Sequence, residues 1–178
     1  TPAGPYTSWE TAASNIQDAV NAAANNSTVW VGSGRYTVPT NTTNYWGSNV
    51  VYINRPLSLR SSNSSPDTVI IDGEGKHRGL TWYFSSSSTS IFLLDGLTIT
   101  NCSATNMGGG ILFAPSPASY NVTATVQNCV LSDNTAQSDS ASHNSAGGGF
   151  YFYSGSGFGL TLSNCVIRNN ISTNTASG

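Results

Sequence analysis

The sequence predicts an all-β chain folded as a parallel β-helix, a solenoid in which short strands stack in successive rungs. Two observations predict it: short segments of alternating apolar and polar residues recur, and glycine triplets recur between them. Alternation with a period of two is typical of a strand with one buried face. A unit of three short strands cannot bury that face alone, so the units must stack. At roughly 25–35 residues per rung, the chain holds about five rungs.

Three Asn-Cys dipeptides mark the repeat: Asn101-Cys102, Asn128-Cys129 and Asn164-Cys165. Aligned on the cysteines, the preceding strands overlie one another, and we expect the asparagines to form an amide ladder with the cysteines, buried and reduced, in a ladder beside it. The cysteines are 27 and then 36 residues apart. This uneven spacing predicts insertions that leave the solenoid at one corner, over residues 114–120 and 135–146.

Cysteine spacing predicts no metal site, because neither a Cys-x-x-Cys motif nor a zinc-type Cys/His pattern occurs. A disulfide between two of the three cysteines requires Cα atoms within about 7 Å. The glycine triplets each lead into an apolar strand, at residues 111–113 and 150–152. No Lys-Ser/Thr pair or helix follows them, so we interpret them as tight turns rather than phosphate loops. The turn glycines are Gly108, Gly109, Gly110, Gly147, Gly148 and Gly149.

One short amphipathic helix is predicted over residues 12–24. Ser14 and Gln17 have the spacing of a capping box, and apolar residues follow at helical spacing. The helix is too short to be stable alone in water, so it must cover the first rung. Residues 1–11 then form an extended arm, residues 25–178 form the coils of a single domain, and we expect the C-terminal end to be uncapped.

Four segments of the N-terminal half carry a family resemblance: 16–23, 29–36, 53–59 and 69–73. Their pattern, Ile-Gln-x-Ala-Val-x-Ala-Ala, Gly-x-Gly-x-Tyr, Ile-x-x-Pro-Leu-x-Leu and Val-Ile-x-Asp-Gly, resembles the opening of right-handed β-helix proteins of the pectin-lyase-like class. The later repeats resemble those of polymorphic outer-membrane proteins, autotransporter passengers and secreted repeat proteins of bacteria. The resemblance implies a right-handed parallel β-helix with the helix as its cap. It does not fix an activity, because this fold hosts enzymes, adhesins and structural modules.

Composition excludes some classes of partner. The net charge is −2 and only 8% of residues are charged, whereas Ser, Thr and Asn make up 67 of 178 residues. A nucleic-acid binder would show a basic patch, and membrane insertion would require a longer apolar run. A chain solvated by hydroxyls and amides is expected to be extracellular or at the cell surface.

Candidate chemistry is sparse. Asp72, Glu74, Lys76 and Arg78 form the densest charged segment and are the only candidates for a calcium-dependent lyase site. Asp72 also opens an Asp-Gly turn, which explains the same charges as a solvated turn. The favoured interpretation has no catalytic residue, no metal and no cofactor, with calcium only under the lyase alternative.

Aromatic residues offer a second kind of site. Consecutive aromatics cannot all point inward on a strand, so Tyr83, Tyr151 and Tyr153, or their neighbours, must face outward. They could stack on sugar rings, pack against another subunit, or lie beneath an insertion loop.

The function expected from these observations is a non-catalytic, extracellular structural or adhesive module. A β-helix has two open ends, and association of one end with the other end of a second copy would build a filament. The alternatives are a polysaccharide lyase and a carbohydrate-binding module with a polysaccharide ligand.

Overall fold

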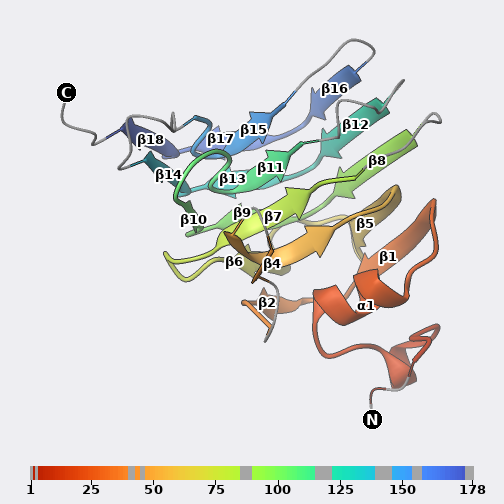
Figure 1. Cartoon of the computed structure of the whole chain (residues 1–178). Helices are drawn as coiled ribbons and strands as arrows, with labels where there is room; N and C mark the ends of the chain where they lie inside the picture. Colours follow the sequence, from red (N-terminus) through yellow and green to blue (C-terminus); the bar gives the residue numbers. More distant parts are fainter. Residues whose placement is uncertain are drawn as a thin grey trace.

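The computed structural model describes residues 2, 4–39, 43–44, 47–84, 90–114, 122–138, 146–153 and 158–174. These residues form a parallel β-solenoid of about four turns with one α-helix at its N-terminal end (Figure 1). The predicted all-β class and parallel stacking are therefore confirmed. The helix lies at one end of the stack, and the last three strands lie at the other.

The described residues form four sheets that run along the solenoid, and the fourth begins only at β10. Among the described strands, all pairings are parallel except that of β3 with β4. The first sheet holds β1 (Ser27–Val31), β5 (Leu57–Ser61), β8 (Ser90–Asp95), β12 (Val122–Gln127) and β16 (Phe158–Ser163). The second holds β2 (Gly34–Tyr36), β6 (Val69–Asp72), β9 (Thr98–Thr100), β13 (Val130–Ser132) and β17 (Val166–Arg168). The third holds β3 (Thr43–Asn44), β4 (Gly47–Ile53), β7 (Arg78–Trp82), β11 (Ile111–Phe113) and β15 (Phe150–Phe152), and the fourth holds β10 (Ser103–Ala104), β14 (Thr135–Ser138) and β18 (Ile171–Asn174).

The core is a set of columns in which like residues lie over like. One column of the first sheet is entirely aliphatic, and its register partners are Val29, Leu59, Leu94, Val126 and Leu162. Beside the third sheet the interior is filled by aromatic rings: Trp82, Phe84, Phe92, Phe113 and Phe152. Because side chains alternate along a strand, the intervening residues face outward. A shift of the strand register by one residue would therefore move the core side chains to the outer face.

Helix α1 (Ile16–Ala22) covers the N-terminal end of the core and is shorter than the predicted 12–24. The predicted capping box is wrong. The N-cap is Asn15, whose Oδ1 accepts from the Asp18 N–H at 2.8 Å. Gln17 is buried instead, and its amide exchanges two hydrogen bonds with the backbone of Tyr52, at 2.7 and 3.0 Å. Gln17 thus attaches the helix to β4 through hydrogen bonds to the strand backbone, like those that a neighbouring strand would form. Before the helix, η1 (Trp9–Thr11) forms a turn of 3-10 helix.

The predicted insertions are only partly described. Residues 115–120 and 139–145 lie outside the described residues. The start of the second predicted insertion is a strand, β14, which pairs with β10 and β18. Its sequence, Thr-Ala-Gln-Ser, contains no large apolar residue, although Ala136 and Ser138 are buried. The strand periodicity of this segment was therefore not visible in the sequence, because its buried side chains are small.

Candidate functional site

The three Asn-Cys dipeptides lie at corners where the chain turns between sheets. Asn101, Asn128 and Asn164 have φ of 51°, 52° and 50°. This left-handed conformation is costly for most residues, and asparagine is among the few that tolerate it. The motif is thus a turn signal for the backbone.

The predicted single ladder of three Asn-Cys pairs is wrong, because the pairs occupy two different corners. Asn128 and Asn164 follow strands of the first sheet, whereas Asn101 follows β9 of the second sheet. The register places Thr100 over Ser132, so the corner partner of Asn101 is Asp133. Register partners there are 32 residues apart, so the 27-residue cysteine interval does not correspond to this turn. The alignment of the three Asn-Cys dipeptides was misleading because both corners need the same left-handed turn, and both therefore select asparagine.

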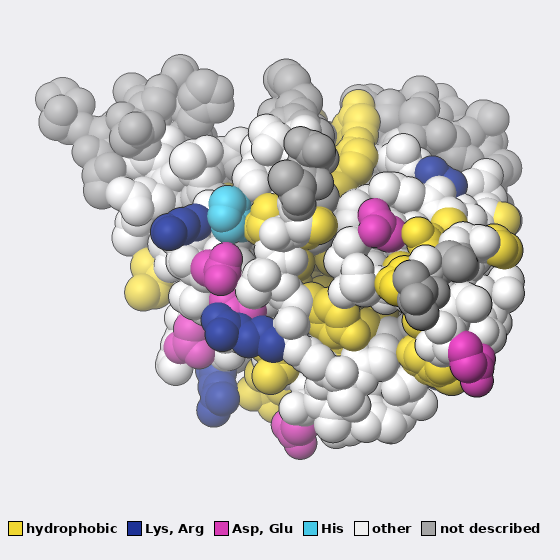
Figure 2. Space-filling view, turned by 90° about the horizontal axis from the view of Figure 1, so that it is seen from below, with side chains coloured by type: hydrophobic (Ala, Val, Ile, Leu, Met, Phe, Trp, Pro, Cys, Tyr) yellow, Lys and Arg dark blue, Asp and Glu magenta, His cyan; other side chains and the backbone are white. Residues whose placement is uncertain are grey.

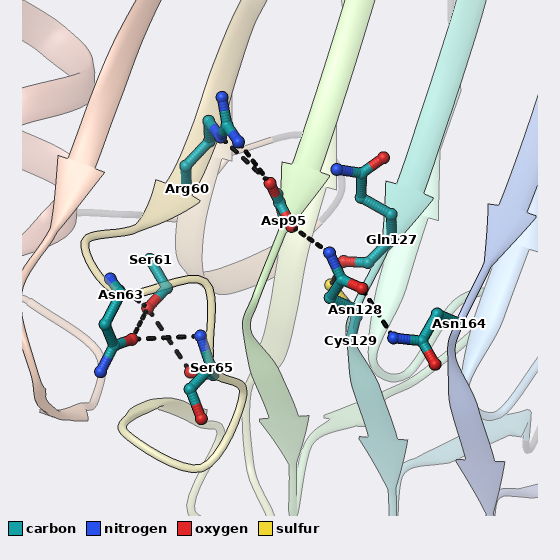
Figure 3. A network of polar contacts seen from close by, with 9 residues as sticks. All are labelled: Arg60, Ser61, Asn63, Ser65, Asp95, Gln127, Asn128, Cys129 and Asn164. Atoms are coloured by element: carbon teal, nitrogen blue, oxygen red, sulfur yellow. Dashed lines mark hydrogen bonds and ion pairs between the residues drawn. The ribbon is translucent and has the colours of Figure 1, made fainter.

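At the first corner a chain of polar side chains runs up the solenoid (Figure 3). Arg60 donates two hydrogen bonds to Asp95, at 2.7 and 3.1 Å. Asn128 donates to Asp95 at 2.8 Å, and Asn164 donates to Asn128 at 2.7 Å. Burial opposes ionisation of Asp95, but the hydrogen bonds from Asn128, Gln127 and Arg60 outweigh it and lower the pKa of that carboxyl.

At the second corner the polar contacts form an outer and an inner set. On the outside, Asn101 donates to Asp72 at 3.1 Å, and Asn169 donates to Asp133 at 3.2 Å.

The inner set is centred on Asn134, which is fully buried. Its Oδ1 accepts from the Cys102 N–H, and its Nδ2 donates to the Ile99 carbonyl and to Asn170. The sequence repeats Asp133-Asn134 as Asn169-Asn170, and this repeat is the signal that identifies the inner ladder.

The cysteines are all free thiols. Cys102 and Cys129 are buried, and Cys165 is half-buried. Burial raises the pKa of the Cys102 thiol to about 12. Cys129 and Cys165 are register partners and interact with each other, which raises the pKa of Cys129 and lowers that of Cys165 to about 6.

The two glycine triplets stack directly on each other. Ile111 is in register with Phe150, and the Gly110 N–H donates to the Gly148 carbonyl at 2.9 Å. A Cβ at Gly109 would lie 2.2 Å from the carbonyl oxygen of Thr135. The triplets therefore permit close backbone approach at a corner, which agrees with their interpretation as turns.

The charged segment does not form one site. Asp72 binds Arg35 at 2.8 Å and accepts the Glu74 N–H, so residues 72–75 form a turn, as in the alternative interpretation. The Asp72 carboxylate is buried in this turn, however, and only Glu74 and Gly75 are exposed. Lys76 is exposed, whereas Arg78 is buried and donates to the carbonyls of Gly108 and Met107 and to Asn106. Burial lowers the Arg78 pKa to about 10. Among the described residues, no group of three or more His, Cys, Asp or Glu side chains lies together as metal ligands would.

The outward tyrosines do not make a continuous platform. Tyr153 is exposed, but Tyr83 and Tyr151 are half-buried. The register partner of Tyr151 in the turn below is Leu112, which is buried. Hence the residue directly below Tyr151 in this column of the third sheet is a buried leucine, and tyrosines do not run continuously along the column.

The N-terminal end holds a hollow of about 940 Å³ between η1, α1 and β1. Tyr6, Trp9, Trp30 and Tyr36 are among the residues that line it, and its described lining contains no Lys, Arg, Asp or Glu. The guanidinium of Arg60 lies 5.0 Å from the centroid of the Trp30 ring. Trp9 is 61% exposed. Figure 2 shows this end of the molecule, with hydrophobic side chains near the centre and most charged ones nearer the margins. Sequence reasoning missed these tryptophans because they are 21 positions apart in the chain.

The opposite end is a terminal layer made of β16, β17 and β18. Leu162 and Ile167 are exposed in this layer, although their register partners one turn below, Val126 and Leu131, are buried. Val166 and Ile171 are also exposed, but they lie over residues that are themselves half-buried, and Phe158, Leu160 and Cys165 are partly exposed. Arg168 is the one charged residue among 158–174. This layer is a second candidate surface.

No protein-family model, curated protein or solved structure matches the chain significantly. In the described part of the chain, no helix combines the length and apolar character needed to cross a lipid bilayer.

Proposed function

We propose that this protein is a non-catalytic, extracellular structural or adhesive solenoid that associates end to end. The observation that carries the proposal is the exposed apolar terminal layer. Isolated exposed apolar residues are normal on protein surfaces, but a contiguous group indicates an interaction surface. The proposed occupant is the N-terminal end of a second copy, which presents Trp9 and Trp30 around an uncharged hollow.

Two features support head-to-tail contact. The described lining of the hollow has no Lys, Arg, Asp or Glu, and Arg168 is the one charged residue among 158–174, so bringing these two surfaces together desolvates few ions. Arg60, which packs over the Trp30 ring, would be the nearest cation at the N-terminal end. The two ends differ, so the contact between copies is heterologous. If the rotation from one copy to the next does not close a ring, the contact repeats into a filament. Because α1 occupies the N-terminal end of the core, side chains rather than continuous strands would make the contact.

The test compares two lysine variants on one strand. Ile167 and Val166 are 50% and 51% exposed. Ile167 lies over buried Leu131 and so belongs to the end face, whereas Val166 lies over half-buried Val130 and points to the side. By multi-angle light scattering and electron microscopy, we expect the parent chain and Val166→Lys to form elongated oligomers and Ile167→Lys to stay monomeric.

The result that contradicts this proposal is a parent chain that stays monomeric at all concentrations. Equal loss of association in both lysine variants would place the contact on the side of the solenoid instead. Circular dichroism of each variant establishes that the strands remain folded.

A second function is favoured by the hollow at the N-terminal end. Exposed aromatic rings in an uncharged, hydroxyl-lined groove are suited to stacking on a neutral polysaccharide. We propose this groove, rather than the predicted tyrosines, as the carbohydrate site. Titration with neutral and uronic-acid oligosaccharides, followed by tryptophan fluorescence, tests it. Trp9→Ala should abolish binding and Tyr153→Ala should not; an unchanged affinity in Trp9→Ala would exclude the groove.

A further inference from the structure

Cys129 and Cys165 occupy equivalent positions in adjacent turns. The register pairs Gln127 with Ser163 before them and Val130 with Val166 after them, so the two cysteines are opposite each other. The backbone hydrogen bond from Val166 N–H to the Cys129 carbonyl, at 2.9 Å, continues the pairing through the corner. Strands paired in this way are about 4.8 Å apart. That spacing lies within the Cα separation of about 4.4–6.8 Å found in disulfides.

The two side chains also point the same way. The Cys129 sulfur lies 3.0 Å from the carbonyl oxygen of Gln127, and the Cys165 sulfur lies 3.3 Å from that of Ser163, each two residues earlier in the chain. The Cys165 sulfur is also 3.3 Å from the carbonyl oxygen of Val126, in the turn that holds Cys129. Cys165 therefore leans toward its partner, and the two thiols interact directly.

The third cysteine is an internal control. Cys102 lies at the other corner, and its register partner is Asn134, which accepts its N–H. It has the same preceding asparagine and the same burial as Cys129, but no sulfur above it. Any chemistry that depends on sulfur proximity should spare it.

We propose that Cys129 and Cys165 form a disulfide that covalently joins the terminal layer to the turn below, with a low-molecular-weight disulfide as the oxidant. The Cys165 thiolate attacks one sulfur of the oxidant, forms a mixed disulfide and releases one small thiolate. Cys129 loses its proton and attacks the Cys165 sulfur, which releases the second small thiol. Two protein thiols and one small disulfide thus give one protein disulfide and two small thiols.

The environment suits this order of steps. Cys165 is half-buried, so the small disulfide can reach it, whereas Cys129 is covered and can act only as the resolving thiol. The interaction with Cys129 lowers the pKa of Cys165, which raises the fraction of its thiolate, the nucleophilic form. Disulfides persist in oxidising compartments, which matches the proposed extracellular location but does not depend on end-to-end association.

The linkage would stabilise the part of the molecule that has a neighbour on one side only. The disulfide would join residues 36 positions apart, the same separation as that between Asn128 and Asn164. A cross-link that closes a loop of this length restricts the conformations of the unfolded chain. We therefore expect the midpoint of thermal unfolding to rise by about 5–10 °C on oxidation.

The test treats the full chain with oxidised glutathione and measures intact mass and peptide linkage. We expect a monomer lighter by two hydrogen atoms, a peptide pair linked through Cys129 and Cys165, and after denaturation a reactive thiol at Cys102 alone. Cys102→Ser should form the same bond, and its thermal midpoint should rise on oxidation as in the parent chain. Cys165→Ser should show no rise.

Other outcomes overturn the proposal. They are three thiols that stay reactive, a glutathione adduct that persists on Cys165 without resolution, a bond that includes Cys102, and a bond between chains. Cys129→Ser distinguishes the steps, because it should accumulate the mixed disulfide at Cys165. Failure of end-to-end association would leave each of these readouts unchanged.

Discussion

The turn formed by β12, β13 and β14 and the terminal layer above it have nearly the same local sequence and different surroundings. Asn128-Cys129-Val130-Leu131 repeats as Asn164-Cys165-Val166-Ile167, and the two asparagines have the same left-handed φ. Leu131 is 1% exposed, but its register partner Ile167 is 50% exposed. The backbone shape therefore comes from local turn chemistry, whereas burial comes from the neighbouring turn. Matched substitutions in the two layers separate these contributions.

The largest difference is expected at the inner asparagines. Asn134→Ala removes three hydrogen bonds and leaves the Cys102 N–H and the Ile99 carbonyl buried without that partner. Each such group costs about 1–3 kcal/mol, so we expect a loss of about 4 kcal/mol in the free energy of unfolding, measured by urea denaturation.

The control is Asn170→Ala, one turn above. Asn170 also accepts and donates within the ladder, but it is half-buried, so water can replace its amide. We expect a loss of about 1 kcal/mol. Equal losses in the two variants would contradict the view that burial sets the strength of the ladder.

The next largest difference is expected in the apolar columns. Leu131→Ala creates a cavity beneath Ile167 and should lower stability by about 3 kcal/mol. Ile167→Ala removes a side chain that is half in contact with water and should lower it by about 1 kcal/mol. If the chain associates end to end, the Ile167→Ala loss should grow with protein concentration, because partner binding then adds to stability.

The smallest effect concerns the polar chain that links the turns at the first corner. Asp95→Asn removes the charge that Arg60 contacts and should cost about 1 kcal/mol at pH 7. The folded pKa of Asp95 is below its unfolded value, so its carboxylate stabilises the fold above about pH 4, and this contribution is lost as the pH falls through the folded pKa.

Denaturation curves at several pH values test this prediction. Asp95→Asn should lose stability less steeply on acidification than the parent chain, and the exposed corner variant Asp133→Asn serves as the control. A parent chain and an Asp95→Asn variant with parallel pH profiles would show that Asp95 does not contribute to acid sensitivity.

Much of the fold was predictable because strands and turns carry local signatures. The alternation around Val126 and Leu162 predicted strands with an inward face, and the glycine triplets predicted a tight corner. Register between turns was less accessible. Asn101 resembles Asn128 locally, yet it belongs to another corner, because a left-handed turn selects asparagine wherever it occurs.

The candidate surfaces were predicted less well, and for a different reason. Trp9 and Trp30 border one hollow only because the fold brings η1, α1 and β1 together around it, and no periodicity connects the two residues. Tyr151 and Tyr153 were expected outside by alternation alone, but how far each is covered depends on the chain around it.

The sequence by itself determined that this chain stacks parallel strands, turns at asparagines and glycines, and carries few charges, since these follow from backbone conformation and side-chain type. Only the tertiary structure decided which cysteines are partners, which asparagine is buried and which apolar side chains remain in water. Those outcomes depend on the number of residues between corners and on whether another layer lies above. Both are properties of the stack, because a β-solenoid buries a side chain only through the turn next to it.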